Sequence, residues 1–117
     1  MASNRMARVN EELQRELAAL IPTVKDPRVA EAGMISVTGV DATADLKQAK
    51  VYISVLDKSR EGETLKGLKS AAGYLRREVG RALSLRATPE LFFIADNSID
   101  KGAHILKILR SLDDKEN

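Results

Sequence analysis

The chain has 117 residues and no cysteine; 44% of its residues are hydrophobic and 31% are charged. A chain of this length can bury one core without disulfides, and its composition is typical of an ordinary folded domain rather than a disordered segment. The lack of cysteine excludes disulfides, thiolate metal sites and cysteine nucleophiles, and it suits a reducing cytoplasm. The longest uncharged runs, 17–24 and 32–40, are too short to span a bilayer, so we expect a cytoplasmic protein.

The charge is distributed unevenly along the chain. The block from Lys58 to Arg86 has eight basic and three acidic side chains, a net charge of +5. All other residues together have eleven basic and fourteen acidic side chains, a net charge of −3. Clustered basic charge on a nearly neutral protein is typical of nucleic-acid binding, although exposed lysines and arginines often serve only solubility.

The first half of the chain predicts one helix and a pair of strands. Apolar residues at helical spacing predict a helix over 4–21. Pro22 just before it, Pro27 within it and several polar side chains predict a connecting loop over 23–33. Alternating, β-branched segments then predict strands over 34–41 and 49–56, which we expect to form a hairpin.

The second half predicts two more helices and a third strand. A helical pattern runs over 60–84, Pro89 opens a short apolar strand over 91–95, and helical spacing returns over 99–112. Residues 113–117 are expected to be a solvated tail. The whole chain, 1–117, is therefore predicted to be a single α+β domain in which helices cover a small sheet.

The helix predicted over 60–84 is interrupted in its middle by the small residues Ala71, Ala72 and Gly73. A glycine in a helix interior costs roughly 1 kcal/mol relative to alanine, and it permits backbone angles that other residues resist. We therefore expect a kink at these three residues, with Gly73 setting its angle.

Basic side chains gather on both sides of this kink. At about 100° per residue, the arginines after the kink lie on a different side of the helix from the apolar residues, and Gly80 and Ser84 lie among them. A nearly bare backbone there would let phosphates approach closely. The residues predicted to bind RNA are Lys66, Lys69, Arg76, Arg77, Arg81 and Arg86.

Residues 62–70 resemble a phosphate-binding P-loop with one residue too many. The lysine of a P-loop directly follows the second glycine, from which it reaches the β- and γ-phosphates. Here Leu68 follows Gly67, which displaces Lys69 by about 100° of helix. The chain has one histidine, His104, and no Gly-x-Ser-x-Gly pattern, so no catalytic set of residues is complete. We therefore predict no enzyme, no cofactor, no metal and no small-molecule substrate.

Aromatic side chains are too few to indicate a stacking surface for single-stranded bases, which needs exposed rings. The chain has Tyr52, Tyr74, Phe92 and Phe93. Tyr52 and Phe92 could lie on the sheet face opposite the helices, but we expect both to pack in the core.

Three groups of residues stand in a specific order and spacing along the chain. They are Asn4-Arg5-Met6-x-Arg8-Val9-Asn10-Glu11, then Val37-Thr38-x-Val40 with Asp45-Leu46-x-x-Ala49-x-Val51-Tyr52-x-Ser54, and last Pro89-Glu90-Leu91-x-Phe93-x-x-Asp96-x-Ser98. Over about residues 4–112 the chain resembles the bacterial ribosome-binding factor A family.

This resemblance implies a type II KH-like fold with the order αββα(kink)αβ and an additional C-terminal helix. Ordinary KH domains hold a nucleic-acid backbone with a Gly-x-x-Gly loop, and no two glycines of this chain are three residues apart. The family has instead a kinked helix pair with Ala-x-Gly at the junction, which matches Ala71, Ala72 and Gly73.

The resemblance also implies a function. It indicates an assembly factor that binds the immature small (30S) ribosomal subunit and its 16S ribosomal RNA, supports late maturation and 5′-end processing of the precursor, and is needed especially in the cold. No large apolar surface is evident, so we expect a monomer without membrane contact. The alternative is a protein-interaction module that uses its sheet face or first helix and makes no RNA contact.

Overall fold

The computed structural model describes residues 2–85 and 87–96. The elements in chain order are α1 (Ala2–Leu20), the 3-10 turn η1 (Ile21–Thr23), α2 (Pro27–Ala30), β1 (Ile35–Ala42), β2 (Gln48–Val55), the 3-10 turn η2 (Lys58–Arg60), α3 (Glu61–Ser70), α4 (Ala72–Leu83) and β3 (Glu90–Ala95). The predicted α+β class is confirmed. The helix predicted over 99–112 and the tail over 113–117 lie outside the described residues.

The three strands form one sheet in the order β1-β2-β3. β1 and β2 are antiparallel, with Val40 opposite Val51, so the predicted hairpin is confirmed. β3 runs parallel to β2, with Phe93 opposite Val51. The parallel pairing follows from the connection, because α3 and α4 carry the chain back across the sheet before β3 begins.

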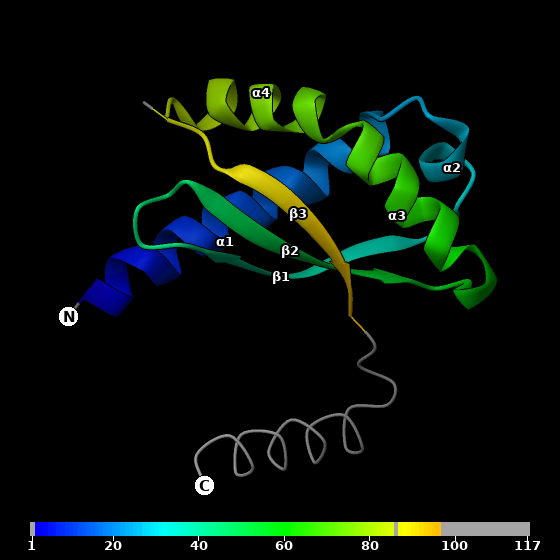
Figure 1. Ribbon diagram of the computed structural model, residues 1–117, viewed down its shortest axis with the longest axis horizontal. Coiled ribbons are helices and arrows are strands. Elements are labelled where there is room, and N and C mark those ends of the chain that lie inside the picture. Colours follow the sequence, from blue (N-terminus) through cyan, green and yellow to red (C-terminus); the bar gives the residue numbers. More distant parts are fainter. Residues whose placement is uncertain (1, 86, 97–117) are drawn as a thin grey trace, which may run out of the picture.

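The helices cover one face of this sheet and form the core with it. In Figure 1, α1 runs behind the strands, α4 lies at the top of the view and α3 lies to its right. Every second residue of β2 is buried, as expected for a strand with one face in the core. Among the residues that the structure describes, the apolar side chains with no exposed surface are Leu13, Leu17, Val51, Ile53, Val55, Leu68, Leu75 and Val79.

The opposite face of the sheet is not covered by any of the described residues. Phe92 is 41% exposed and Ile94 is 36% exposed, and both alternate with buried neighbours along β3. Tyr52 alternates with Val51 and Ile53 along β2, so its ring lies on the same open face. The prediction of core packing is therefore wrong for Phe92 and for Tyr52, which is only half-buried.

A short helix, α2, occupies part of the loop predicted over 23–33. Asp26 begins it, because its Oδ1 accepts a hydrogen bond of 2.9 Å from the Arg28 N–H, and Pro27 takes the first helical position. Both are ordinary signals of a helix start. Four residues are too few to show an apolar period, which is why the pattern over 23–33 predicted only a loop.

The predicted interruption of the helix over 60–84 is confirmed, and the structure locates it at one residue. α3 ends at Ser70, α4 begins at Ala72, and Ala71 between them has φ −90° and ψ 1°. Gly73 lies inside the first turn of α4, where an added Cβ would meet nothing within 4 Å. The backbone thus departs from helical geometry at Ala71, two residues before Gly73, and a role of Gly73 in setting the angle stays a prediction.

Candidate nucleic-acid interface

The outer surface of α3 and α4 carries most of the predicted RNA-binding residues. Five of them are described, and all five are exposed or partly exposed: Lys66, Lys69, Arg76, Arg77 and Arg81. The sixth, Arg86, lies outside the described residues. Amphipathic sequences explain this placement, since burial of the apolar stripes on the sheet leaves the basic side chains in solvent.

Arg77 and Arg81 lie on the side of α4 away from its buried residues Leu75 and Val79. Arg81 is 73% exposed and approaches Glu78 at 3.6 Å. An exposed pair of this kind contributes only about 0–1 kcal/mol, so a phosphate can compete for the guanidinium group. Arg77 makes no ion pair or side-chain hydrogen bond with any described residue.

Arg76 has a structural contact that the sequence analysis missed. Its Nε donates a hydrogen bond of 3.0 Å to the Thr88 carbonyl oxygen, which ties α4 to the loop before β3. The Thr88 side chain also fills the space over Gly80, because a Cβ added at Gly80 would overlap with Thr88 Oγ1. The prediction that phosphates approach a bare backbone at Gly80 is therefore wrong.

Lys66 and Lys69 provide the basic charge of α3. Lys66 is 67% exposed and lies 3.5 Å from Glu63, another weak surface pair. Lys69 makes no ion pair with a described residue, and it lines a cavity of about 860 Å³ together with Ala72. The other lining residues come from β3, from Glu90 to Ile94, and from β1, β2 and the turn between these two strands. Because Lys69 and Ala72 flank the break between α3 and α4, the break lies beside this cavity.

The basic block from Lys58 to Arg86 divides into two parts in the structure. At the start of α3, Lys58 lies 3.3 Å from Glu61, and Arg60 both pairs with Asp57 and donates a hydrogen bond of 2.7 Å to the Glu31 carbonyl oxygen. These cations stabilise local structure. Farther along, Lys66, Lys69, Arg77 and Arg81 have weak ion-pair partners or none among the described residues, so these four side chains carry the charge available to a polyanion.

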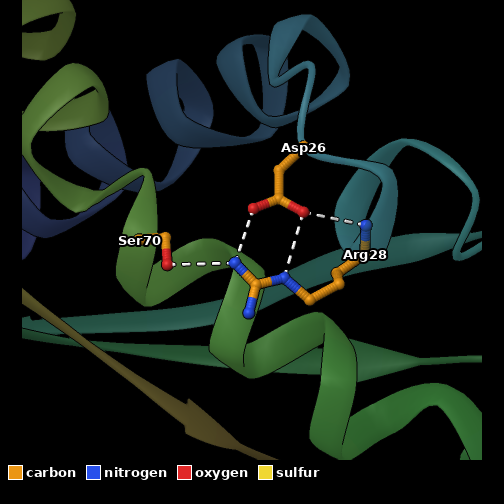
Figure 2. Close-up of polar contacts among 3 residues, drawn as sticks. All are labelled: Asp26, Arg28 and Ser70. Atoms are coloured by element: carbon orange, nitrogen blue, oxygen red, sulfur yellow. Dashed lines mark hydrogen bonds and ion pairs between the residues drawn. The ribbon is translucent and has the colours of Figure 1, made fainter.

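A polar network at the junction of α3 and α4 was also missed. Arg28 donates hydrogen bonds to both carboxylate oxygens of Asp26, at 3.1 and 2.7 Å, and a third bond of 3.1 Å to Ser70 Oγ (Figure 2). The Arg28 hydrogen bonds hold the pKa of Asp26 below its usual range, because they favour the charged carboxylate. The pair Asp26-Pro27 is the sequence signal that could have located this network.

The segment 62–70 that resembles a P-loop is helical, because α3 runs from Glu61 to Ser70. The backbone of this segment is therefore wound into a helix and does not form a phosphate-binding loop. Among residues 2–85 and 87–96, no group of three or more histidine or acidic side chains is placed to hold a metal ion. No helix of this part of the chain is both long and apolar enough to cross a membrane.

Comparison with known proteins agrees with the resemblance found in the sequence. A family model described as ribosome-binding factor A matches residues 5–109. The ribosome-binding factor A of Acetivibrio thermocellus is 49% identical over 107 residues, which cover 90% of this chain and 85% of that protein. The protein of the same name from Clostridium botulinum strain Loch Maree is 48% identical, with 100% of this chain and 96% of that protein covered.

Solved structures show the same similarity. The crystal structure of ribosome-binding factor A from Thermus thermophilus aligns with a TM-score of 0.69 and 27% identity, covering 77% of this chain and 93% of that one. A homology model of the T. thermophilus factor, fitted into a cryo-electron microscopy map of a 30S complex, aligns with a TM-score of 0.59 and 25% identity, covering 73% and 88%. The sequence, the matched family model and these structures agree, and the chain belongs to the ribosome-binding factor A family.

Proposed function

We propose that this protein is a ribosome assembly factor that binds the immature small (30S) subunit and its 16S ribosomal RNA in the cytoplasm. The observation that carries the proposal is the 30S complex of a relative whose fold matches 73% of this chain. The basic surface of α3 and α4 supplies the charge that such a partner requires. From the family resemblance we further propose that binding promotes late maturation and 5′-end processing of the precursor, especially in the cold, without the protein itself being the nuclease.

In this proposal the outer cations of the helix pair contact phosphates of folded RNA. Lys66, Lys69, Arg77 and Arg81 are the principal contacts, while Arg76 has its Nε engaged with Thr88 and contributes its remaining guanidinium nitrogens. Arg86 completes the set. Phosphate contacts supply affinity and orientation but carry no sequence information, so the choice of site comes from the shape of the ribosomal surface.

Charge reversal on α4 tests the proposal. The double variant Arg77→Glu with Arg81→Glu should lose cosedimentation with purified small subunits, because two phosphate contacts become repulsive. Its thermal unfolding should stay close to that of the original protein, since neither side chain is buried and surface positions usually change stability by about 0.5 kcal/mol or less.

The matched control is Arg8→Glu with Arg15→Glu, which makes the same change in net charge on exposed positions of α1. This control should still cosediment. Retention of the α4 variant on the subunits, or equal loss of both variants, would contradict the assignment of the interface to α3 and α4.

A second candidate function is a protein-interaction module, and the open face of the sheet favours it. Phe92 and Ile94 expose apolar surface there beside Tyr52. If this face binds the partner, Phe92→Ser should abolish binding while the charge-reversed α4 variant binds normally. The first proposal expects the opposite pair of results.

A further inference from the structure

The break between α3 and α4 falls on alanine rather than on the nearby Gly73. Alanine has the highest helix propensity of all residues, and both Ala71 and Ala72 stand at the break. At φ −90° and ψ 1°, Ala71 lies in a sparsely populated region of backbone space. Gly73 makes a bend near this point easier, but the backbone freedom of a glycine alone does not determine its angle, so contacts from elsewhere in the chain can fix the break at Ala71.

One such contact ends α3. Figure 2 shows the Arg28 guanidinium group between the Asp26 carboxylate and the hydroxyl of Ser70, the last residue of α3. The two parallel bonds to Asp26 fix the plane of the guanidinium group, so its third bond reaches Ser70 from a defined direction. A lysine would keep the charge but lose this geometry.

A second contact begins α4, on the other side of Ala71. Tyr74, in the first turn of α4, has its hydroxyl 2.8 Å from Thr23 Oγ1. The Thr23 hydroxyl donates its one hydrogen to the Leu20 carbonyl oxygen at 2.6 Å, so the Tyr74 hydroxyl is the donor to Thr23. The ends of the segment 23–28 are thus bonded to both helices.

This segment is itself firmly attached to the core. Val24 is 5% exposed and Val29, just beyond the segment, is 3% exposed. α2 also lies directly on α3, since a Cβ added at Gly67 would be 2.8 Å from Val29 Cγ2 and 3.0 Å from Arg28 Cβ. A rigidly held segment that bonds to both sides of a break can determine the angle between the two helices.

We propose that the segment 23–28, here named the brace, sets the angle between α3 and α4, and that Arg28 and Tyr74 are positioning residues for RNA binding. They act by placing Lys69, at the end of α3, relative to Arg77 and Arg81 on α4. A folded RNA surface presents phosphates at fixed positions, so only a matching arrangement of cations contacts all of them at once. The effect on binding rests on the proposed function, whereas the angle is a property of the fold alone.

The angle can be measured without any ligand. The chain has no cysteine, so Glu63→Cys and Ala82→Cys allow one spin label on an exposed position of each helix. We call the protein with both Arg28→Lys and Tyr74→Phe the brace variant. Pulsed electron paramagnetic resonance should show a broader distribution of distances between the two labels in the brace variant than in the labelled protein without these substitutions. Gly73→Ala is the matched control and should leave the distribution unchanged, because its Cβ meets nothing. An unchanged distribution in the brace variant would overturn the proposal.

Binding to purified small subunits provides the second measurement. The brace variant keeps the net charge, so we expect the same salt dependence of binding. Its affinity should be roughly fivefold lower, as expected when the free energy of about one hydrogen bond is lost. Arg77→Ala, which removes a direct contact, should instead lower the salt slope by about one. Unchanged affinity of the brace variant would refute the positioning role. If Arg77→Ala also has no effect, the proposed function fails, and the spin-label result still decides the brace.

Discussion

Asp26 joins two structural roles in one side chain. Its Oδ1 caps α2 through the Arg28 N–H, and both carboxylate oxygens accept hydrogen bonds from the Arg28 side chain. The hydrogen bond to Asp26 raises the pKa of Arg28, and the negative charges of Asp26 and then of Glu63 on α3 add to this effect. The brace therefore depends on a carboxylate that must remain ionised.

This dependence predicts a pH effect on stability. The folded pKa of Asp26 is lowered, so its contribution is fully present above the unfolded value of about 3.9 and is lost as the pH falls through the folded pKa. Asp26→Asn keeps a good helix cap but removes the ion pair. The variant should be less stable at pH 7, and the difference should shrink as the pH falls below the unfolded value.

Chemical denaturation at a series of pH values measures this difference. Glu12→Gln is the control, because Glu12 is exposed on α1 and makes no ion pair with a described residue. A stability difference for Asp26→Asn that stays constant as the pH is lowered through this range would show that ionisation of Asp26 does not stabilise the brace.

At the scale of elements, periodicity was sufficient to predict α1, the helical segment that contains α3 and α4, the hairpin and the third strand. It could not predict which residue interrupts the helix over 60–84, because Arg28 and Thr23 hold that break from 42 and 51 positions away in the sequence. Arg76 was assigned to RNA for the same reason, since its partner carbonyl at Thr88 becomes a neighbour only through folding. Charge and periodicity can be read from neighbouring residues in the sequence, whereas these contacts join residues of different elements and form only in the fold.

Two glycines of α3 provide a prediction about packing between elements. A Cβ at Gly67 would lie 2.8 Å from Val29 Cγ2, so Gly67→Ala must push α2 away from α3. Overpacking of this kind typically costs about 1–3 kcal/mol, more than the roughly 1 kcal/mol that alanine gains in helix propensity. Gly67→Ala should therefore lower the free energy of unfolding.

Gly62→Ala is a control in the same helix, because a Cβ there meets nothing within 4 Å. It should leave stability unchanged or raise it slightly. Equal stabilisation by both substitutions, measured by urea unfolding, would contradict close packing of α2 on α3.

At the scale of the whole molecule, the fold separates two surfaces of different chemistry. The cations of α3 and α4 lie on the outer side of these helices, and the exposed apolar side chains Phe92 and Ile94 lie with Tyr52 on the open face of the sheet. Burial of the apolar faces of the helices and strands against one another produces this separation. The two proposed modes of binding therefore use different surfaces, and they differ in how they respond to salt.

Binding through phosphates releases condensed counterions, so the logarithm of the association constant should fall linearly with the logarithm of the salt concentration. Replacing Lys69, Arg77 and Arg81 together by alanine should reduce that slope by about three if each contacts one phosphate. Replacing Arg5, Arg8 and Arg15 on α1 by alanine removes the same charge and should leave the slope nearly unchanged. A shallow slope in the original protein, unaffected by the triple substitution but accompanied by loss of binding in Phe92→Ser, would instead locate the interface on the open sheet face, because apolar contacts release few counterions.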